Sequence, residues 1–470
     1  SGVLYVLDEP TIGLHARDTT RLLTALRQLT ARGNTVCVVE HDLSVVAAAD
    51  HVVDMGPTGG RDGGHICRQG SPAQLQRAGD SSTGAALGAP LAVASSSRVQ
   101  AKTPRVQLLQ AHAHNLQHVD LHLPLGAMTV VTGVSGSGKS TLIRQLLQPA
   151  VRAALHGERF DGAYKALRGA SALRRVLEVD QSPVGRTPRS VPATYLGIWD
   201  TIRKQLAGTP SARAYGFGPA HFSFNTAGGR CEACAGQGTQ HMEMAFLPPV
   251  HLPCARCGGQ RFAPDVLEVR YKGLHVGDIL DLDIAAAAAC FAAIPAVRRP
   301  LEFVQALGLG YLKLGQPSHT LSGGEAQRIK LAAELGAGKP EGALYILDEP
   351  STGLHRGDVT RLIAALQGLV QRGATLVVIE HQLDVVAAAD WVVDLGPEGG
   401  AGGGQILFAG PPQDLLQQGQ SATADALRQE LAAGDGATQR DAARQRKSRS
   451  RRRTSGKSMA SGGASSTKRV

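Results

Sequence analysis

Short apolar runs alternate with amphipathic stretches along most of the chain. Met128–Thr132 and Leu376–Ile379 are runs of strand length rich in β-branched residues, and each is followed by a glycine or a charged residue. Between such runs, apolar residues recur on one helical face: Leu142, Ile143, Leu146 and Leu147 in one stretch, and Val359, Leu362, Ile363, Leu366 and Val370 in another. Strands that alternate with helices form parallel sheets, so the pattern predicts an α/β fold with ligands at the carboxyl ends of the strands.

The chain also repeats itself, because Leu4–Pro10 recurs as Leu344–Pro350, an offset of 340 residues. The matches continue without a gap at that offset: Gly13-Leu14-His15 with Gly353-Leu354-His355, Glu40-His41 with Glu380-His381, and Asp54-Met55-Gly56-Pro57 with Asp394-Leu395-Gly396-Pro397. A period this long is too great for a solenoid and indicates two copies of a whole domain. We expect the chain to hold the end of the first copy and all of the second.

This repeat sets the predicted domain boundaries. Residues 1–79 are expected to be the remnant of the first copy and residues 105–418 the second copy. Residues 80–104, rich in Ser, Ala, Gly and Thr without helical or strand periodicity, are predicted to be a linker. Since Ser1 stands where a start Met would be and a buried-strand pattern begins at Leu4, we expect a fragment in which residues 1 to about 75 pack poorly.

The net charge of +10 comes from the end of the chain. From Arg440 onward there are eleven Lys or Arg against one Asp, so the basic and acidic residues before Arg440 balance. Residues 419–470 are therefore predicted to be a disordered basic tail, a solvated extension in preference to a phosphate-binding segment. The longest apolar stretch, Ile284 to Ile294, is too short to span a bilayer, so we expect a cytoplasmic protein with no membrane contact.

A phosphate-binding loop is predicted where the Met128–Thr132 strand meets the following helix. The sequence from Gly133 to Ser140 fits G-x-x-x-x-G-K-[ST] at every fixed position. Backbone N–H groups of such a loop surround phosphate oxygens, which is why it needs glycines. Lys139 would reach the terminal phosphates and Ser140 would ligate Mg²⁺. The predicted ATP-binding residues here are Gly133, Ser135, Gly136, Ser137, Gly138, Lys139, Ser140 and Thr141.

An acidic pair ends a second buried strand, as a nucleotide-hydrolysing site requires. Asp348 is suited to binding Mg²⁺ and Glu349 to polarising the attacking water. His381 ends the next strand, where it could contact the terminal phosphate or hold that water. An isolated histidine is often only a satisfied polar group, but His41 stands at the matching place in the first copy.

Four of the seven cysteines form two Cys-x-x-Cys pairs, Cys231 with Cys234 and Cys254 with Cys257. Their spacing and flanking glycines are typical of a structural zinc site, with iron as the alternative ion and a reducing compartment implied. The insertion that carries them is expected at about residues 215–265. Cys37 and Cys290 are expected to be core residues, and Cys67 has no evident partner.

Leu321-Ser322-Gly323-Gly324-Glu325 resembles the signature motif of ABC ATPases, and Gln181 resembles the catalytic glutamine of their Q-loop. The resemblance implies a signature region at about residues 266–335. It also implies that Ser322, Gly323, Gly324 and Glu325 contact a nucleotide held by another copy of the domain. Because Lys139 and Ser322 belong to the same copy, we expect weak hydrolysis unless two copies associate head-to-tail.

The zinc module is similar to that of the UvrA family, the damage-recognition subunits of excinucleases. The resemblance rests on Phe222–Asn225, Gly229–Cys234, Phe246–Pro248 and Gly185–Ser190. It implies an ATPase, not itself the nuclease, that uses ATP, Mg²⁺ and Zn²⁺, recognises damaged double-stranded DNA and loads the helicase-like UvrB protein of the excinuclease. The full-length form would be a homodimer. Candidate DNA contacts, each also compatible with local ion pairing, are Arg186, Arg189, Arg230, Arg256 and Arg261.

Three other functions share part of this pattern. The ATPase subunit of an ABC transporter has the P-loop, signature and acidic pair, and so does a translation-associated or regulatory ABC protein. The cysteine-bearing insertion is not expected in either. A drug-resistance relative of UvrA is harder to distinguish, because the region that docks the UvrB protein, which would separate the two, is expected upstream of Ser1.

Overall fold

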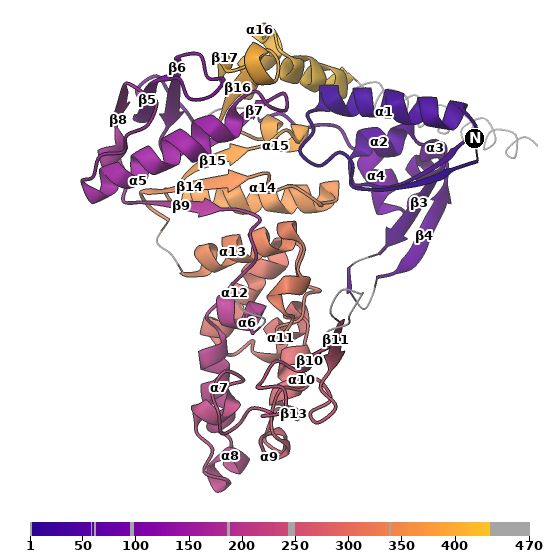
Figure 1. The fold of residues 1–470 in the computed structure, drawn as a ribbon, viewed down its shortest axis with the longest axis vertical. Helices are drawn as coiled ribbons and strands as arrows, with labels where there is room; N and C mark the ends of the chain where they lie inside the picture. The colour runs from indigo at the N-terminus through magenta and orange to yellow at the C-terminus, as the bar shows by residue number, and fades with distance from the viewer. Residues whose placement is uncertain are drawn as a thin grey trace, which may run out of the picture.

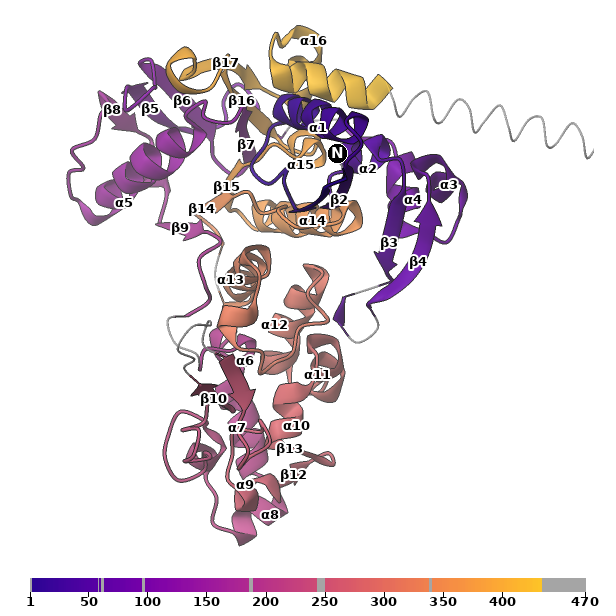
Figure 2. The same ribbon diagram turned by 45° about the vertical axis from the view of Figure 1, so that its right-hand side comes forward.

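The computed structural model describes residues 2–432 except 58, 61–62, 95–97, 186–188, 243–249 and 338–339. Figure 1 shows a head that contains the main β-sheet, and a long arm that extends away from it. The turned view in Figure 2 shows the same division, with the elements of the first repeat at one side of the head.

The main sheet has six strands in the order β17-β16-β7-β15-β14-β9. All neighbouring strands are parallel except β16 and β17, which pair antiparallel. The strands are β7 (Met128–Gly133), β9 (Arg175–Val179), β14 (Ala343–Asp348), β15 (Thr375–Ile379), β16 (Trp391–Gly396) and β17 (Gln405–Gly410). The two runs predicted to be buried strands are β7 and β15, every residue of which is buried.

Both faces of this sheet are covered, which explains its near-continuous apolar strands. One face packs on helices η2 (Thr141–Leu147) and α5 (Gln148–His156) and on a three-stranded antiparallel sheet. The other face packs on α14 (Arg356–Gln371), α15 (Leu383–Ala387) and α16 (Pro412–Gln418) and continues into the arm. The small sheet consists of β5 (Arg105–Ala111), β6 (Val119–Pro124) and β8 (Ala166–Arg168).

The arm is mainly helical and runs from residue 192 to residue 337 (Figure 1). Its helices are α6 (Pro192–Tyr195), α7 (Trp199–Ala207), α8 (Pro210–Ala214), α9 (Pro264–Leu267), α10 (Val276–Asp281), α11 (Ile284–Cys290), α12 (Pro295–Ala306) and α13 (Gly323–Ala337). Two antiparallel hairpins complete it, β10 (Thr239–Met242) with β11 (Val250–Pro253), and β12 (Arg270–Tyr271) with β13 (Leu274–His275). In the described part of the chain, no helix combines the length and apolar character needed to cross a membrane.

The first repeat contributes two separate two-stranded sheets. β1 (Leu4–Asp8) pairs with β2 (Thr35–Val39), and β3 (Val52–Gly56) pairs with β4 (His65–Gly70). In the second repeat β7 lies between the strands that correspond to β2 and β3. The helices of the first repeat are α1 (Ala16–Ala31), α2 (Leu43–Ala48), α3 (Pro72–Arg77) and α4 (Ser82–Gly88).

The poor packing expected for the first repeat is confirmed. Leu4 is 62% and Val6 67% exposed, although both lie on a strand with a buried-strand sequence. Cys37 is also exposed, so the prediction of a core cysteine was wrong. A buried-strand pattern presupposes layers on both faces, and the described residues do not supply them around β2. Cys290 is half-buried at the end of α11.

The segment predicted to be a linker begins with a helix, α4. Leu91 is buried, and the Ala94 N–H donates to the Ala387 carbonyl at 2.9 Å. The Ser81 hydroxyl donates to Asp54 at 2.6 Å and provides the N-cap of α4. Capping and burial therefore order a stretch whose small residues carry no periodic signal.

The predicted tail also begins later than residue 419. Residues 422–432 are helical, and Ala424 and Leu427 are buried. Thr423 donates to Asp394 at 3.0 Å, as Thr83 donates to Asp54 at 2.6 Å, so the repeat continues to these positions. The basic residues from Arg440 onward lie outside the described residues.

Candidate nucleotide site and cysteine cluster

The predicted phosphate-binding loop connects β7 to helix η2 at the carboxyl end of the parallel strands. Gly133 has φ +130°, and a Cβ there would lie 1.9 Å from the Leu395 carbonyl oxygen, so only glycine fits. Gly138 has φ +103° at the entry to the helix. One continuous segment, from the last residue of β7 to the first residue of η2, therefore holds the predicted ATP-binding residues Gly133, Ser135, Gly136, Ser137, Gly138, Lys139, Ser140 and Thr141.

Lys139 is buried and folds back onto this loop. Its Nζ donates to the carbonyl oxygens of Gly133 at 2.7 Å and Val134 at 3.1 Å. Burial lowers the pKa of the ammonium, while the Glu349 carboxylate opposes that change. The lysine thus lies beside the loop with carbonyl contacts that a phosphate could replace.

Asp348 and Glu349 end β14 on the same edge of the sheet. Burial raises the pKa of both carboxyl groups; Arg144 opposes the rise for Asp348, and His381 opposes it for Glu349. Glu349 has φ +48°, in the left-handed region that a non-glycine residue rarely adopts. His381 Nε2 lies 3.8 Å from Glu349 Oε1. The structure therefore brings the predicted base and histidine together.

The signature helix α13 approaches this edge from the arm, and Gln181 approaches it from the segment that follows β9. The Gln181 Nε2 lies 3.5 Å from the Glu349 carbonyl oxygen and 3.4 Å from Thr352 Oγ1. A Cβ on Gly323 would lie 3.1 Å from Gln181 Oε1, so the first residues of α13 are next to this glutamine. Within the motif, the Glu325 carboxylate accepts from the Ser322 N–H at 2.8 Å. Ser322, Gly323, Gly324 and Glu325 thus form one turn at the start of α13.

Two polar residues at the site were given no role from sequence. Gln327 on α13 is buried and donates to the carbonyl oxygens of Asp348 at 2.8 Å and Val179 at 2.9 Å, which ties the signature helix to two strands. Arg144 on η2 donates to Asp348 Oδ2 at 2.8 Å. The only sequence signal for either residue was its place beside a recognised motif.

The first repeat reproduces the acidic edge. Glu9 has φ +42°, and His41 Nε2 lies 3.4 Å from Glu9 Oε1. The loops that follow the two acidic pairs face each other, because Gly13 lies opposite the Glu349 carboxylate and Gly353 lies opposite the Glu9 carboxylate. The arrangement is nearly two-fold, and each copy extends a glycine toward the other copy's glutamate.

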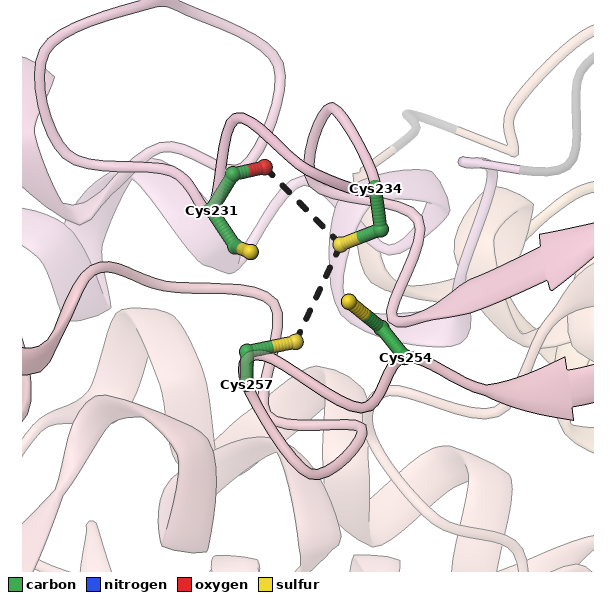
Figure 3. A group of neighbouring side chains, drawn as sticks. All are labelled: Cys231, Cys234, Cys254 and Cys257. Atoms are coloured by element: carbon green, nitrogen blue, oxygen red, sulfur yellow. Dashed lines mark hydrogen bonds between the residues drawn. The ribbon is translucent and has the colours of Figure 1, made fainter.

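The four cysteines of the two pairs meet in the arm. Their Sγ atoms all lie within 4.8 Å of one another, and Figure 3 shows the four sulfurs converging on one point. Cys234 Sγ and Cys257 Sγ are 3.8 Å apart. Four thiolates at about 2.3 Å from a tetrahedral zinc have nearly this sulfur–sulfur spacing. Backbone N–H groups of Gly238 and Arg261 point at two of the sulfurs, as partners of thiolate ligands do. The donor set fits a closed tetrahedral metal site.

The five candidate DNA contacts occupy different environments. Arg256 is exposed beside the cysteine cluster, and Arg189 is half-buried. Arg230 forms an ion pair with Glu232 at 3.1 Å. Arg261 is only 6% exposed: its Nη2 donates to the Gly315 carbonyl at 2.8 Å and its guanidinium lies over the Phe224 ring. The Arg261 side chain therefore packs inside the arm, and its contact with DNA stays a prediction. Arg186 lies outside the described residues.

The chain is similar in sequence to a family model and to proteins of known family. A family model described as the viral superfamily 1 RNA helicase core domain matches residues 129–182, which contain the P-loop. The chain is 51% identical over 443 residues to UvrABC system protein A of Haemophilus ducreyi, covering 92% of this chain and 46% of that protein. It is 50% identical over 421 residues to UvrABC system protein A of Thermus thermophilus, covering 89% and 44%.

The chain is also similar to solved structures. UvrA2 from Deinococcus radiodurans matches with a TM-score of 0.84 and 46% identity over 91% of this chain and 52% of that one. A model of ribosome-bound archaeal Pelota and ABCE1 matches with a TM-score of 0.50 at 16% identity, which shows a shared ABC ATPase fold only. The chain spans about half the length of the curated relatives it matches. On these identities, and with an ABC-type head joined to a four-cysteine arm, the chain belongs to the UvrA family.

Proposed function

We propose that this chain binds and hydrolyses ATP as part of ATP-dependent recognition of damaged DNA in nucleotide excision repair. The observation that carries the proposal is the meeting of Lys139 and Asp348-Glu349 at one edge of a sheet whose arm holds four converging cysteines. The names of the relatives support an excinuclease subunit. We place ATP hydrolysis in this chain, and strand cleavage in other subunits of the excinuclease.

In the proposed reaction, the amides of residues 133–140 hold the phosphates. Lys139 exchanges its carbonyl contacts for the terminal phosphates. When bound, Mg²⁺ neutralises phosphate charge, and Ser140 and Asp348 are its proposed protein ligands. Glu349 accepts a proton from the attacking water as the water oxygen bonds to the terminal phosphorus. The bond from that phosphorus to the bridging oxygen then breaks, and ADP leaves. The raised pKa of Glu349 suits it to accept this proton.

The neighbours of Glu349 would orient this reaction. His381 lies close enough to Glu349 to orient both its carboxylate and the water. Gln181 contacts the loop after Glu349 and could report the state of the nucleotide to the arm. Because Ser322–Glu325 belong to the same copy of the ABC domain as Lys139, we propose that they act on a nucleotide held by another copy of that domain. The two copies within this chain already face each other through Gly13 and Gly353. We propose separately that the full-length protein is a homodimer.

For the arm, we propose a structural zinc ion at the cysteine cluster, since four protein thiolates leave no open coordination position. The exposed Arg256 beside the cluster would contact DNA phosphates. The proposed partners are damaged double-stranded DNA and the UvrB protein of the excinuclease, and the proposed location is the cytoplasm.

The test is the ATPase rate of the whole chain with no DNA, with undamaged duplex and with the same duplex carrying a bulky lesion. We expect DNA to change the rate, with a larger change for the damaged duplex. Glu349→Gln serves as the control, because it should bind ATP and fail to hydrolyse it. A rate that responds to neither duplex would contradict the proposal and favour a transporter-type or regulatory ATPase. A response equal for both duplexes would contradict damage recognition alone.

A further inference from the structure

Arg144 joins the helix after the P-loop to the acidic end of β14. Its Nη1 donates to Asp348 Oδ2 at 2.8 Å, and its Nε donates to Glu178 Oε1 at 2.6 Å. Gln148, one turn further along the same helical stretch, donates to the other Glu178 oxygen at 2.7 Å. The guanidinium is thus held at two points and presented to a single oxygen of Asp348.

The positions of these residues follow from the fold. Arg144 comes four residues after Ser140, so the two side chains lie on one face of the helical stretch, about one turn apart. Glu178 lies on β9, directly opposite Ile346 of the neighbouring β14, two residues before Asp348. The contact between Arg144 and Asp348 therefore connects the two elements that carry the proposed magnesium ligands.

The contact uses Oδ2 of Asp348. Among the described residues, no hydrogen bond is found to Oδ1. Asp348 and Glu178 are each 23% exposed in their side chains, so Arg144 is a cation facing two largely buried carboxylates. Glu178 offsets the charge of Arg144 and leaves the charge of Asp348 for a metal ion. A fixed cation on one carboxylate oxygen directs the other oxygen toward an incoming ligand.

We propose that Arg144 is a positioning residue for the divalent cation: by holding Asp348 Oδ2, it fixes the carboxylate and leaves Oδ1 for the cation. This inference rests on the proposed ATP and Mg²⁺ site. Glu178 and Gln148 keep the guanidinium in place. The opposite relationship, in which Arg144 competes with the cation for Asp348, predicts tighter cation binding when the arginine is removed.

The experiment measures cation binding without turnover. The whole chain carrying Glu349→Gln is titrated with Mn²⁺ in the presence of ATP, and free Mn²⁺ is followed by electron paramagnetic resonance. Arg144→Met should weaken Mn²⁺ binding by about tenfold or more, as losing a group that orients a metal ligand does. Affinity for a fluorescent ATP analogue in excess chelator should stay unchanged, since Arg144 is bonded to Glu178 and Asp348 and has no proposed role in binding the phosphates. Arg144→Lys keeps the positive charge and loses the two-point contact. Its Mn²⁺ affinity should lie between that of Arg144→Met and that of the parent chain.

The matched control is Arg152→Met, because Arg152 is an exposed arginine of the adjoining α5. It should leave Mn²⁺ binding unchanged. Equal Mn²⁺ affinity of Arg144→Met and the parent chain, or tighter binding by Arg144→Met, would overturn the inference. If Arg144→Met does not fold, the Mn²⁺ affinities of Arg144→Lys and Glu178→Gln are compared with that of the parent chain. Both should be weaker, and equal or tighter binding would overturn the inference. A parent chain that binds neither the analogue nor Mn²⁺ with ATP would instead contradict the proposed function.

Discussion

The Ser135 hydroxyl donates a hydrogen bond to the Gly13 carbonyl at 2.8 Å, across 122 residues of sequence. Ser135 belongs to the P-loop of the second repeat, and Gly13 belongs to the loop after the acidic pair of the first. Gly13 also lies opposite the Glu349 carboxylate. The first repeat therefore forms part of the wall of the second repeat's proposed site.

Gly13→Ala should lower ATP hydrolysis severalfold and leave ATP affinity unchanged. Gly13 has φ +72°, and an added Cβ would lie 3.8 Å from Glu349 Oε2, so relief of the strain, about 1 kcal/mol, would move the loop against the proposed base. The measurement is the steady-state ATPase rate beside equilibrium nucleotide binding. Gly157→Ala is the control, because Gly157 has φ +70° with nothing within 4 Å of an added Cβ. An equal loss of rate in both variants would show that strain alone, and not the position of Gly13, is responsible.

The local features of the head could be predicted from sequence because their signals are local. The P-loop follows from residue types at fixed spacing between an apolar run and a helical face, and the structure places it between β7 and η2. The contact between Arg144 and Asp348 could not be predicted, since 204 residues separate the two partners. The contact depends on how the helix η2 and the strand β14 pack together. The hydrogen bond between Ser135 and Gly13 could not be predicted for the same reason, because 122 residues separate these two partners.

Acid should destabilise the fold through His15, which is only 1% exposed. Burial, with smaller contributions from His381 and Lys139, lowers the pKa of His15 from 6.5 to about 4. The unfolded chain takes up the proton near 6.5 and the folded chain does not. The stability that His15 contributes is therefore present above pH 6.5 and is lost as the pH falls toward 4, by about 2 kcal/mol between pH 7 and pH 5.

This pH dependence can be isolated by urea unfolding of the parent chain and of His15→Gln at both pH values. The difference in unfolding free energy between pH 7 and pH 5 should be smaller by about 2 kcal/mol in the variant. His112→Gln is the control, because His112 is exposed. The same pH dependence in all three chains would show that His15 takes up its proton equally easily in the folded state.

Two arginines next to the cysteines should behave in opposite ways. Arg256→Ala should weaken DNA binding and lower the salt slope by about one unit, because an exposed phosphate contact is lost. Arg261→Ala should lower the free energy of unfolding by roughly 1.5–3 kcal/mol, since it removes a buried charged hydrogen bond to Gly315. Binding titrations at several salt concentrations and urea unfolding separate the two effects. A lowered salt slope with unchanged stability in Arg261→Ala would contradict this prediction and show that Arg261 contacts DNA.

The arm also marks the limit of reasoning from residue types. The convergence of the cysteines was predictable, because paired Cys-x-x-Cys turns have a characteristic spacing. The burial of Arg261 was not, since an arginine beside such a turn is usually exposed, and here Phe224 and the Gly315 carbonyl enclose it. The order of residues 82–88 depended on a cap from Ser81, whose hydroxyl is fixed by Asp54 from a distant strand.

Metal removal should unfold the region around the cysteine cluster and leave the main sheet intact. Cys254 is fully buried, and its cluster is a separate group of buried residues, distinct from the two large apolar clusters of the head and arm. Local order there should therefore depend on the ion. In Cys254→Ser or after chelation, amide hydrogen exchange in residues 223–242 and 250–262 should speed up on the order of a hundredfold, while exchange in β7 and β15 stays slow.

Elemental analysis should find zinc bound in the parent chain and in Cys290→Ser, and little in Cys254→Ser. Cys290 is the matched control because it is a half-buried thiol of the same arm outside the cluster. Since four thiolates also suit iron, the identity of the ion is decided by this measurement and not by the geometry. Iron in place of zinc would correct the ion and keep the site. Equal metal content in Cys254→Ser and Cys290→Ser would remove the site itself, and with it the metal-dependent order of the arm.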